Sequence, residues 1–368
     1  MEKKIAVLAG DGIGPEVVAQ GKKALDAVGA RFGHKFTYCH ADVGAIAIDH
    51  WGDPLPESTL ISCVEADAIL FGAIGHPKYD NDPNAKVRPE QGLLRLRKSL
   101  GLFCNIRPVI THPNLLHLSP LRPENVEGVD LVIYRELTSG IYFGEKHLSD
   151  DKMYAFDKCE YHVMEIERIA HLAFKAAGKR KKKVTLVDKA NVLETSRLWR
   201  RTVTEVAKSY PEVKLEYMFV DNAAMQMIIC PKQFDVILTN NMFGDIISDE
   251  SSVLTGSLGM LPSSSIGEKT SMFEPIHGSY PQAAGKDIAN PIGTIFSVAL
   301  MLENFELHKE ARTVRNAVRF CLTKGIGTPD LNPNIKYTCS QMGDIISAWI
   351  EDERLNQAKI SDSVSTII

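Results

Sequence analysis

Short apolar runs alternate along this chain with longer stretches in which apolar residues recur at helical spacing. The short runs are rich in β-branched residues and have the length of buried strands. They predict strands at 5–8, 67–71, 103–106, 130–134, 184–187, 215–220 and 236–238. The longer stretches predict helices at about 15–30, 90–99, 161–178, 193–209, 292–305, 308–324 and 340–354. Because strands and helices alternate, we expect an α/β fold with mostly parallel central sheets.

Four segments show neither pattern. Residues 75–89 form a long polar stretch, and loops of that length inside compact domains are often functional. Residues 111–128 look irregular, 255–265 are small and turn-forming, and 274–291 are rich in turn residues. The length of 368 residues allows two domains or one large α/β unit, and composition marks no boundary between them.

Composition and charge are those of an ordinary globular protein, with 44% hydrophobic and 24% charged residues. A net charge of −4, from 42 basic and 46 acidic residues, gives no reason to expect nucleic acid or a membrane as partner. No apolar run reaches the roughly 18 residues of a membrane span, and the N-terminal segment does not resemble a signal peptide. Seven scattered cysteines without a Cys-x-x-Cys pair suit a reducing compartment, so we expect a cytoplasmic protein.

A glycine-rich turn, Gly10–Glu16, follows the first predicted strand. Its glycines are one residue short of the dinucleotide-binding spacing, and Pro15 occupies the third glycine position. The turn therefore predicts a tight strand-to-helix connection near a ligand, and not a Rossmann fingerprint. The basic run at 179–183 follows a predicted helix and is interpreted as a solvated helix end facing the negative dipole.

Two carboxylates, Asp245 and Asp249, lie four residues apart on the helix predicted after strand 236–238. On one helix face their Cβ atoms would be about 5–6 Å apart. At an effective dielectric near 20 their repulsion would be roughly 3 kcal/mol. In open water the cost falls to a few tenths of a kcal/mol. The pair alone is therefore compatible with a solvated face or with a bound hard cation.

Other candidate residues follow predicted strands in the same way, namely Arg135, Lys189 and Asp221. Ligands of parallel sheets bind beyond the carboxyl ends of the strands. Three carboxylates there suit an oxygen-liganded Mg²⁺ or Mn²⁺. Arginines suit a dicarboxylate substrate, and lysine and tyrosine can serve as acid and base. The candidates of these two kinds also include Arg97, Arg107 and Tyr142.

Motifs spread over nearly the whole chain resemble the β-decarboxylating dehydrogenases, the family of the isocitrate, isopropylmalate, tartrate and D-malate enzymes. These motifs are Gly10–Glu16, Leu93–Arg97, Asn105–Pro108, Arg135–Thr138, Gly140–Gly144, Asp188–Val192, Asp221–Ala223, Asn241–Asp249 and Glu274–Ser279. The resemblance implies two non-Rossmann α/β domains. A cofactor-side domain would comprise 1–102 and 256–368, and a metal, substrate and dimerisation domain would comprise 103–255. It also implies a homodimer in which each active site takes Lys189 and Asp221 from the neighbouring subunit.

The resemblance also implies a role for each site residue. Lys189 would take the hydroxyl proton, and Tyr142 would protonate carbon after loss of CO₂. The metal, Mg²⁺ or Mn²⁺, would be bound by Asp221, Asp245 and Asp249. Substrate would contact Arg97, Arg107, Arg135, Asp221, Leu93, Leu94, Val192 and Glu90. The cofactor NAD would contact Gly75, His76, Glu90, His277, Gly278, Ser279, Gln282, Ile288 and Asn290.

The apolar side chains Leu93, Leu94 and Val192 suit an isopropyl substituent, because a third carboxylate would be desolvated and unpaired there. We therefore expect oxidative decarboxylation of 3-isopropylmalate, with D-malate or tartrate oxidation as the nearest alternative. A metal-assisted hydrolase or phosphate-binding protein lacks support, since no phosphate loop or nucleophile–base motif is present. Two positions depart from the family. Ser139 replaces a common glycine, and Gln282 replaces a common aspartate at the cofactor ribose, so we expect an NAD enzyme that discriminates less strictly against NADP.

Overall fold

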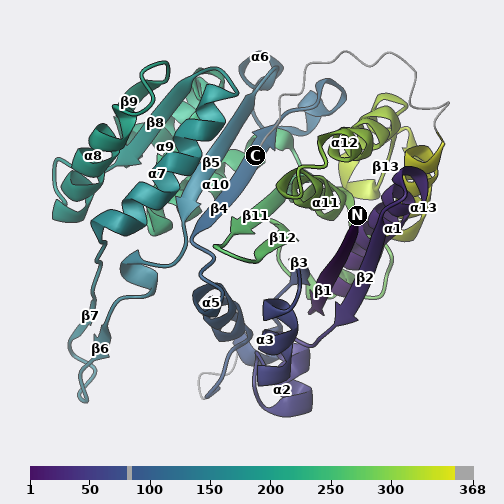
Figure 1. The fold of residues 1–368 in the computed structure, drawn as a ribbon, viewed down its shortest axis with the longest axis horizontal. Coiled ribbons are helices and arrows are strands. Elements are labelled where there is room, and N and C mark those ends of the chain that lie inside the picture. The colour runs from purple at the N-terminus through teal and green to yellow at the C-terminus, as the bar shows by residue number, and fades with distance from the viewer. Residues whose placement is uncertain (81–84, 353–368) are drawn as a thin grey trace. The chain divides into compact units, whose positions relative to one another are not determined.

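The computed structural model describes residues 1–80 and 85–352 of the chain. They form two compact α/β units (Figure 1). The first combines Met1–Leu102 with the described residues from Gly256 onward, and the second is the continuous segment Phe103–Thr255. Within both described ranges, no helix is long and apolar enough to cross a membrane.

The first unit is built on strands in the order β2-β1-β3-β12-β11. All neighbours pair in parallel except β11 and β12, which are antiparallel. A short separate pair, β13 and β14, completes the set. The strands are β1 (Glu2–Gly10), β2 (Lys35–His40), β3 (Ala68–Ala73), β11 (Pro262–Ile266), β12 (Ser271–Pro275), β13 (Ile326–Gly327) and β14 (Ile335–Lys336).

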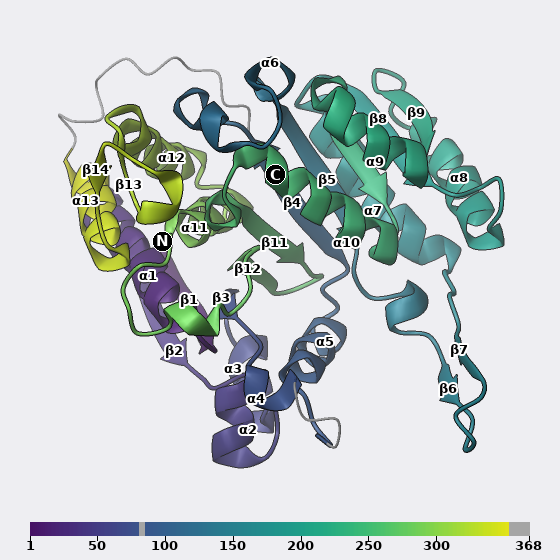
Figure 2. The same ribbon diagram turned by 180° about the vertical axis from the view of Figure 1, so that it is seen from behind.

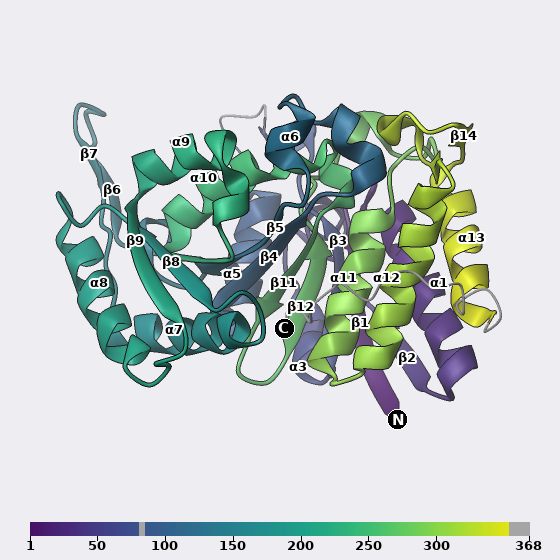
Figure 3. The same ribbon diagram turned by 90° about the horizontal axis from the view of Figure 1, so that it is seen from above.

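Helices cover both faces of these strands, which is why β3 is apolar throughout. Ile69 and Phe71 pack with Leu96 of α5, while Leu70 lies near α1 and α11. Figure 3 shows α11 and α12 side by side with α13 next to them. The helices are α1 (Gly14–Phe32), α2 (Ala45–Trp51), α3 (Glu57–Val64), α4 (Pro77–Asp80), α5 (Pro89–Ser99), α11 (Ile292–Asn304), α12 (His308–Thr323) and α13 (Cys339–Glu351), with short 3-10 turns at Leu258–Met260, Pro281–Ala283 and Pro329–Leu331.

The second unit has strands in the order β4-β5-β10-β8-β9, parallel except where β4 meets β5. A separate hairpin, β6–β7, extends away from the rest of this unit (Figure 2). The strands are β4 (Cys104–Ile110), β5 (Asp130–Glu136), β6 (Lys146–Leu148), β7 (Ala155–Asp157), β8 (Lys183–Asp188), β9 (Lys214–Phe219) and β10 (Val236–Thr239). The helices are α6 (Pro123–Val126), α7 (Val163–Gly178), α8 (Glu194–Ala207), α9 (Val220–Ile229) and α10 (Asn241–Ser252), with 3-10 turns at Pro113–Leu118, Gly140–Tyr142, Pro231–Gln233 and Val253–Thr255.

The predicted α/β class with mostly parallel strands is confirmed, and every predicted strand is present. The short run Val236–Leu238 is completely buried in the middle of its sheet. One of its side chains, Ile237, packs with Ile247 of α10 and Val187 of β8. This packing sets α10, with its two aspartates, directly after the carboxyl end of β10.

Three local predictions were incomplete. Residues 255–265 contain most of β11, whose serines carry no hydrophobic signal and are buried where the strand pairs with β12 and packs against α11. The strand predicted at 215–220 ends before Asp221, and Asp221 lies in the first turn of α9. Within 75–89 the short helix α4 occurs, and residues 81–84 lie outside the described residues. The end of the last predicted helix, 353–354, also lies outside them.

The interpretation of 179–183 as a solvated helix end was wrong for Arg180. Its side chain is only 2% exposed and binds Asp130 at 2.6 Å and Asp235 at 2.9 Å. The two acids more than compensate for burial and raise the pKa of the arginine. Arg180 therefore ties the end of α7 to the strands of its unit.

Candidate active site

The helix α10 carries two of the three predicted metal ligands. Asn240 caps the helix, accepting a hydrogen bond at 2.9 Å from the backbone N–H of Phe243. Asp245 and Asp249 follow on one face, and their side chains are 35% and 69% exposed. The carboxylates are thus accessible, as a metal or substrate site requires.

Asp245 is held by two of the predicted site residues. Its Oδ1 accepts a short hydrogen bond from Nη1 of Arg135, and its Oδ2 accepts one from Tyr142 Oη at 2.9 Å. The Arg135 side chain is almost fully buried at the end of β5. Burial first, and then Asp245, raise the pKa of Tyr142 above its ordinary value of 10. The phenol therefore keeps its proton at neutral pH and can serve as an acid.

Asp249 is paired with the second arginine of this unit. Nη1 of Arg107, on β4, donates to Asp249 Oδ1 at 3.0 Å and to Ser248 Oγ at 2.6 Å. Nε of Arg107 donates to Asn105 Oδ1 at 2.7 Å. Each aspartate thus faces an arginine, which offsets the mutual repulsion of the two carboxylates. Asp249 Oδ2 accepts no hydrogen bond within the described residues, and it offers a hard cation an oxygen ligand.

Lys189 and Asp221 form a separate ion pair. Lys189 directly follows β8 and donates from Nζ to Asp221 Oδ1 at 2.6 Å. This hydrogen bond is the main reason that the pKa of Asp221 lies below its ordinary value. Within the described residues of one chain, Asp221 does not join Asp245 and Asp249 in a group whose ligand atoms all lie within 4.8 Å.

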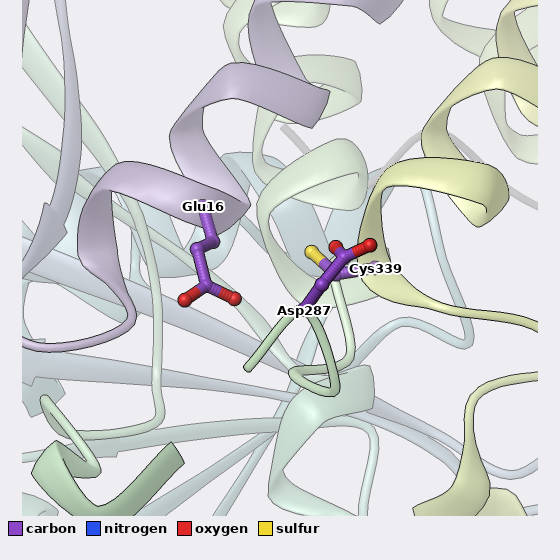
Figure 4. Close-up of side chains that lie close together, drawn as sticks. All are labelled: Glu16, Asp287 and Cys339. Atoms are coloured by element: carbon purple, nitrogen blue, oxygen red, sulfur yellow. The ribbon is translucent and has the colours of Figure 1, made fainter. Parts of the chain in front are cut away.

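A different group in the first unit does meet that distance criterion, namely Glu16, Asp287 and Cys339 (Figure 4). The Asp287 carboxylate is already used, accepting from the Ser340 backbone N–H at 2.8 Å and its hydroxyl at 2.6 Å at the start of α13. Glu16 accepts a hydrogen bond from the N–H of Gly285. Burial raises the pKa of the Cys339 thiol to about 12, so the thiol is protonated and a poor ligand. The group is best explained as a junction that holds residues 285–287 to α1 and α13.

In the first unit, α5 carries Glu90, Leu93, Leu94 and Arg97. Arg97 donates from Nη2 to Glu274 at 3.2 Å, and both side chains are about nine-tenths buried. The buried Nε of Arg97 has no hydrogen bond within the described residues, so the guanidinium retains a donor for an anion. Leu93 packs partly against the core, whereas Leu94 is half-buried outside the described core clusters. In the second unit, Val192 is exposed.

Three of the predicted cofactor residues, Gly75, Glu90 and Ser279, lie next to one another near the end of β3. Gly75 has φ +120°, and a Cβ there would lie 3.3 Å from Glu90 Oε1 and 3.5 Å from Ser279 Oγ. The Gly75 N–H donates to the buried Asp11 carboxylate at 3.0 Å. Glycine thus leaves space beside Glu90 and Ser279 where a ligand can approach the backbone closely. This geometry fits the predicted cofactor contact.

The remaining cofactor candidates differ in what they can offer. His76, Gly278, Gln282 and Ile288 are exposed. Burial lowers the pKa of His277, and its Nε2 is buried without a hydrogen bond within the described residues. The Asn290 side chain donates to Asp330 and accepts from the Ile292 N–H, each at 3.0 Å. Its Nδ2 has a second N–H that can still donate to a ligand.

Sequence reasoning assigned no role to several residues that hold the site. Glu274 pairs with Arg97, Ser248 with Arg107, and Asn241 with Arg135. All three fall inside the motifs that carry the family resemblance, which was the signal that could have identified them. Asp11, within the glycine-rich turn, was missed in the same way.

Comparison with known proteins assigns the class. A model of the isocitrate/isopropylmalate dehydrogenase family matches residues 4–346. The chain is 55% identical over 354 residues to a 3-isopropylmalate dehydrogenase of Bacteroides fragilis, covering 96% of this chain and 99% of the relative. It is 55% identical over 336 residues to a 3-isopropylmalate dehydrogenase of Geobacillus kaustophilus, covering 90% of each chain.

Solved structures that this chain resembles are dehydrogenases of the same kind. An isocitrate dehydrogenase from Methylococcus capsulatus superposes with a TM-score of 0.85 at 33% identity, covering 95% of this chain and all of that one. A β-decarboxylating dehydrogenase from Thermococcus kodakarensis superposes with a TM-score of 0.80 at 34% identity, covering 98% and 100%. The protein is a decarboxylating oxidoreductase. The chain belongs to the isocitrate/isopropylmalate dehydrogenase family, whose 3-isopropylmalate dehydrogenases use NAD and Mg²⁺ or Mn²⁺.

Proposed function

We propose that this chain catalyses the NAD-dependent oxidative decarboxylation of (2R,3S)-3-isopropylmalate to 2-oxo-4-methylpentanoate, a step of leucine biosynthesis. The reaction is inferred from relatives that are named 3-isopropylmalate dehydrogenase and are 55% identical over nearly the full chain. The structural observation that carries the proposal is the cluster on α10, where Asp245 meets Arg135 and Tyr142. The cluster combines an anion-binding group, a cation-binding group and a protonated acid.

The arginines are assigned to the substrate carboxylates. Arg107 and Arg135 are held rigidly in the second unit, which lowers the entropy cost of binding. Arg97 is assigned the same role because its buried Nε has no hydrogen bond within the described residues. Leu93, Leu94 and Val192 are assigned to the isopropyl group, and an apolar wall there disfavours the third carboxylate of isocitrate.

The chemistry divides between the groups at the site. NAD, when bound, would supply the hydride acceptor, and a divalent cation, which Asp245, Asp249 and the partner subunit's Asp221 would hold, would supply Lewis acidity. The partner subunit's Lys189 takes the proton of the C2 hydroxyl. The bond to the β-carboxylate then breaks with release of CO₂. Tyr142, whose phenol is protonated at neutral pH, gives its proton to C3.

The cofactor is assigned to the first unit. Gly75, Glu90 and Ser279 adjoin one another there, and the buried Nε2 of His277 has no hydrogen bond within the described residues. The remaining proposed contacts are His76, Gly278, Gln282, Ile288 and Asn290. This unit is therefore the cofactor-side domain, and residues 103–255 form the metal, substrate and dimerisation domain.

We further propose a homodimer with shared active sites. The support is that one chain does not group Asp221 with Asp245 and Asp249 within its described residues. Large apolar side chains also lie exposed on the second unit, on α9, on α10 and in the β6–β7 hairpin. They are Met225, Ile228, Ile229, Ile246, Leu148 and Met153. Apolar surface of this kind is typical of interfaces between subunits.

The cytoplasm is the proposed location. All seven cysteines, each within the described ranges, carry free thiols, which suits a reducing compartment.

The test is a panel of substrates and cofactors. Purified protein is mixed with NAD or NADP, Mg²⁺ and each of 3-isopropylmalate, D-malate, tartrate and isocitrate, and absorbance at 340 nm is followed. The proposal expects the highest kcat/KM for 3-isopropylmalate with NAD, and loss of the signal in excess chelator. A preference for D-malate or tartrate would instead support the alternative function, oxidation of these smaller substrates. Full activity in excess chelator would show that the reaction does not need a divalent metal.

A further inference from the structure

Asn241, the first residue of α10, is 1% exposed and touches the substrate-binding arginine with both of its oxygens. Its backbone carbonyl accepts from Arg135 Nε at 2.9 Å, and its side-chain Oδ1 accepts from Arg135 Nη2 at 3.0 Å. Nε and Nη2 form one edge of the planar guanidinium. Two acceptors on that edge fix both the position and the plane of the group, and so direct Nη1 toward Asp245.

The other half of the same amide holds a different segment. Nδ2 of Asn241 donates to the backbone carbonyl of Ser139 at 3.0 Å. Ser139 directly precedes the 3-10 turn Gly140–Tyr142, which carries the proposed proton donor. The orientation of the amide is unambiguous, because an arginine only donates and a backbone carbonyl only accepts hydrogen bonds.

The turn is also held from its other side. The Asn241 N–H donates to Tyr161 Oη at 3.1 Å. Tyr161 packs against Gly140 so closely that a Cβ there would lie 2.0 Å from Oη, and Gly140 has φ +78°. The buried start of α10 therefore contacts both the arginine and the tyrosine turn.

We propose that Asn241 is a positioning residue that couples Arg135 to Tyr142, so that carboxylate binding and proton donation share one rigid support. This inference rests on the proposed function for its kinetic consequence. Asn241 does not touch the reacting atoms, and it acts through the two residues that it holds.

Two substitutions separate the two halves of the amide. Asn241→Asp keeps both oxygens on Arg135 but places an oxygen against the Ser139 carbonyl, which repels it. We expect KM for 3-isopropylmalate to stay within about threefold, and kcat to fall about ten- to hundredfold, as loss of a buried hydrogen bond predicts. Asn241→Ala loses both side-chain contacts, so KM should also rise, by about tenfold or more.

The matched control is the neighbouring asparagine. Asn240 caps α10 through the N–H of Phe243, and none of its hydrogen bonds reaches Arg135 or Ser139. Asn240→Ala should lower Tm while leaving kcat and KM within about twofold, since it removes only a helix cap. If the control changes kinetics as Asn241→Asp does, general loosening of α10 explains the effect and the inference is overturned.

Hydrogen exchange of residues 138–144 gives a readout that does not depend on activity. Faster exchange of this turn in Asn241→Asp, and not in Asn240→Ala, supports the coupling even if the parent protein fails to oxidise 3-isopropylmalate, which would overturn only the proposed function. An active parent whose Asn241→Asp variant keeps both kcat and the exchange rate of the turn overturns the inference and leaves the function intact.

Discussion

Tyr142 lies close to the carboxylate of Asp245 and to Arg135, and its proposed role depends on whether its phenol is protonated. Burial and the hydrogen bond to Asp245 raise its pKa above the ordinary value of 10, so the phenol stays protonated through the neutral pH range. A loss of activity in the neutral range as pH rises should therefore come from another group.

Replacing Tyr142 by phenylalanine should leave hydride transfer largely intact and slow the later protonation of carbon. Loss of a positioned acid costs about 10²–10⁴ in rate. Stopped-flow absorbance at 340 nm should therefore show a burst of NADH, one per active site, followed by slow turnover. Tyr38→Phe, on β2 of the other unit, is the control and should behave as the parent, because the Tyr38 hydroxyl donates to Asp26, which is not a candidate site residue. Slowing of the burst by the same factor as turnover would contradict this division of roles.

Leu94 tests the apolar wall, because it is half-buried and lies outside the described core clusters. Leu94→Ser should weaken 3-isopropylmalate relative to smaller malates. A buried branched side chain is worth about 1.5–3 kcal/mol, which corresponds to roughly one to two orders of magnitude in relative kcat/KM. Leu94→Met conserves volume and should keep the ranking. An unchanged ranking in Leu94→Ser would show that this residue does not face the substituent.

Gln282 is exposed on a 3-10 turn, where many family members have an aspartate. A carboxylate accepts hydrogen bonds from the ribose diol and repels a 2′-phosphate, whereas the neutral glutamine amide keeps an acceptor for the diol but does not repel the phosphate. We expect an NAD enzyme with measurable NADP use. Gln282→Asp should lower KM for NAD and suppress NADP turnover, while Gln282→Asn, the uncharged match, should not. A parent that prefers NADP, or constants unmoved in Gln282→Asp, would place Gln282 away from the ribose.

At the scale of elements, the close approach of α10 to β5 determines how Arg135 reaches the other residues of the candidate site. A Cβ at Gly244 would lie 2.5 Å from Cγ and 2.8 Å from Cβ of Arg135. The absence of a side chain at this position lets the arginine run along the helix to reach both Asn241 and Asp245.

Gly244→Ala should therefore destabilise the protein by about 1–3 kcal/mol, the usual cost of overpacking, and raise KM for substrate. Gly178→Ala, at the end of α7, is the matched control because its Cβ would meet only Glu212, at 3.7 Å. Removing a helical glycine there should stabilise by about 0.5–1 kcal/mol. Urea unfolding of both variants checks the prediction, and equal stability changes would contradict it.

At the scale of the whole molecule, the question is whether one chain completes an active site. The proposed dimer brings Lys189 and Asp221 of the partner subunit to the groups on α10. Its two sites would be equivalent by symmetry.

Mixing the inactive variants Lys189→Ala and Arg97→Ala should then restore activity, because each mixed dimer holds one site with both residues intact. Random exchange of subunits makes half the dimers mixed, so roughly a quarter of the parent activity is expected. Arg97→Ala mixed with Arg107→Ala is the control. Each of its sites keeps one defect, and no activity should return. Failure of the first mixture, with exchange verified by mass spectrometry, would argue that each chain completes its own site.

Local sequence alone determined a large part of this protein. Apolar runs such as Val236–Leu238 identified buried strands, and the four-residue spacing of Asp245 and Asp249 placed both on one helix face. These inferences succeed because strand and helix periodicity are properties of the backbone within a few residues. The motifs identified the family in the same local way, and the proposed site residues rest on that resemblance.

Only the tertiary structure decided which distant groups meet. Arg97 pairs with Glu274, which is 177 residues away in the sequence, and Asn241 accepts a hydrogen bond from Arg135, which is 106 residues away. Ser263–Ser265 become buried strand because β12 pairs with them, and Arg180 becomes buried because Asp130 and Asp235 surround it. No window of sequence contains these pairings. They depend on the packing of whole elements, which sets burial, hydrogen-bond geometry and the pKa of each group together.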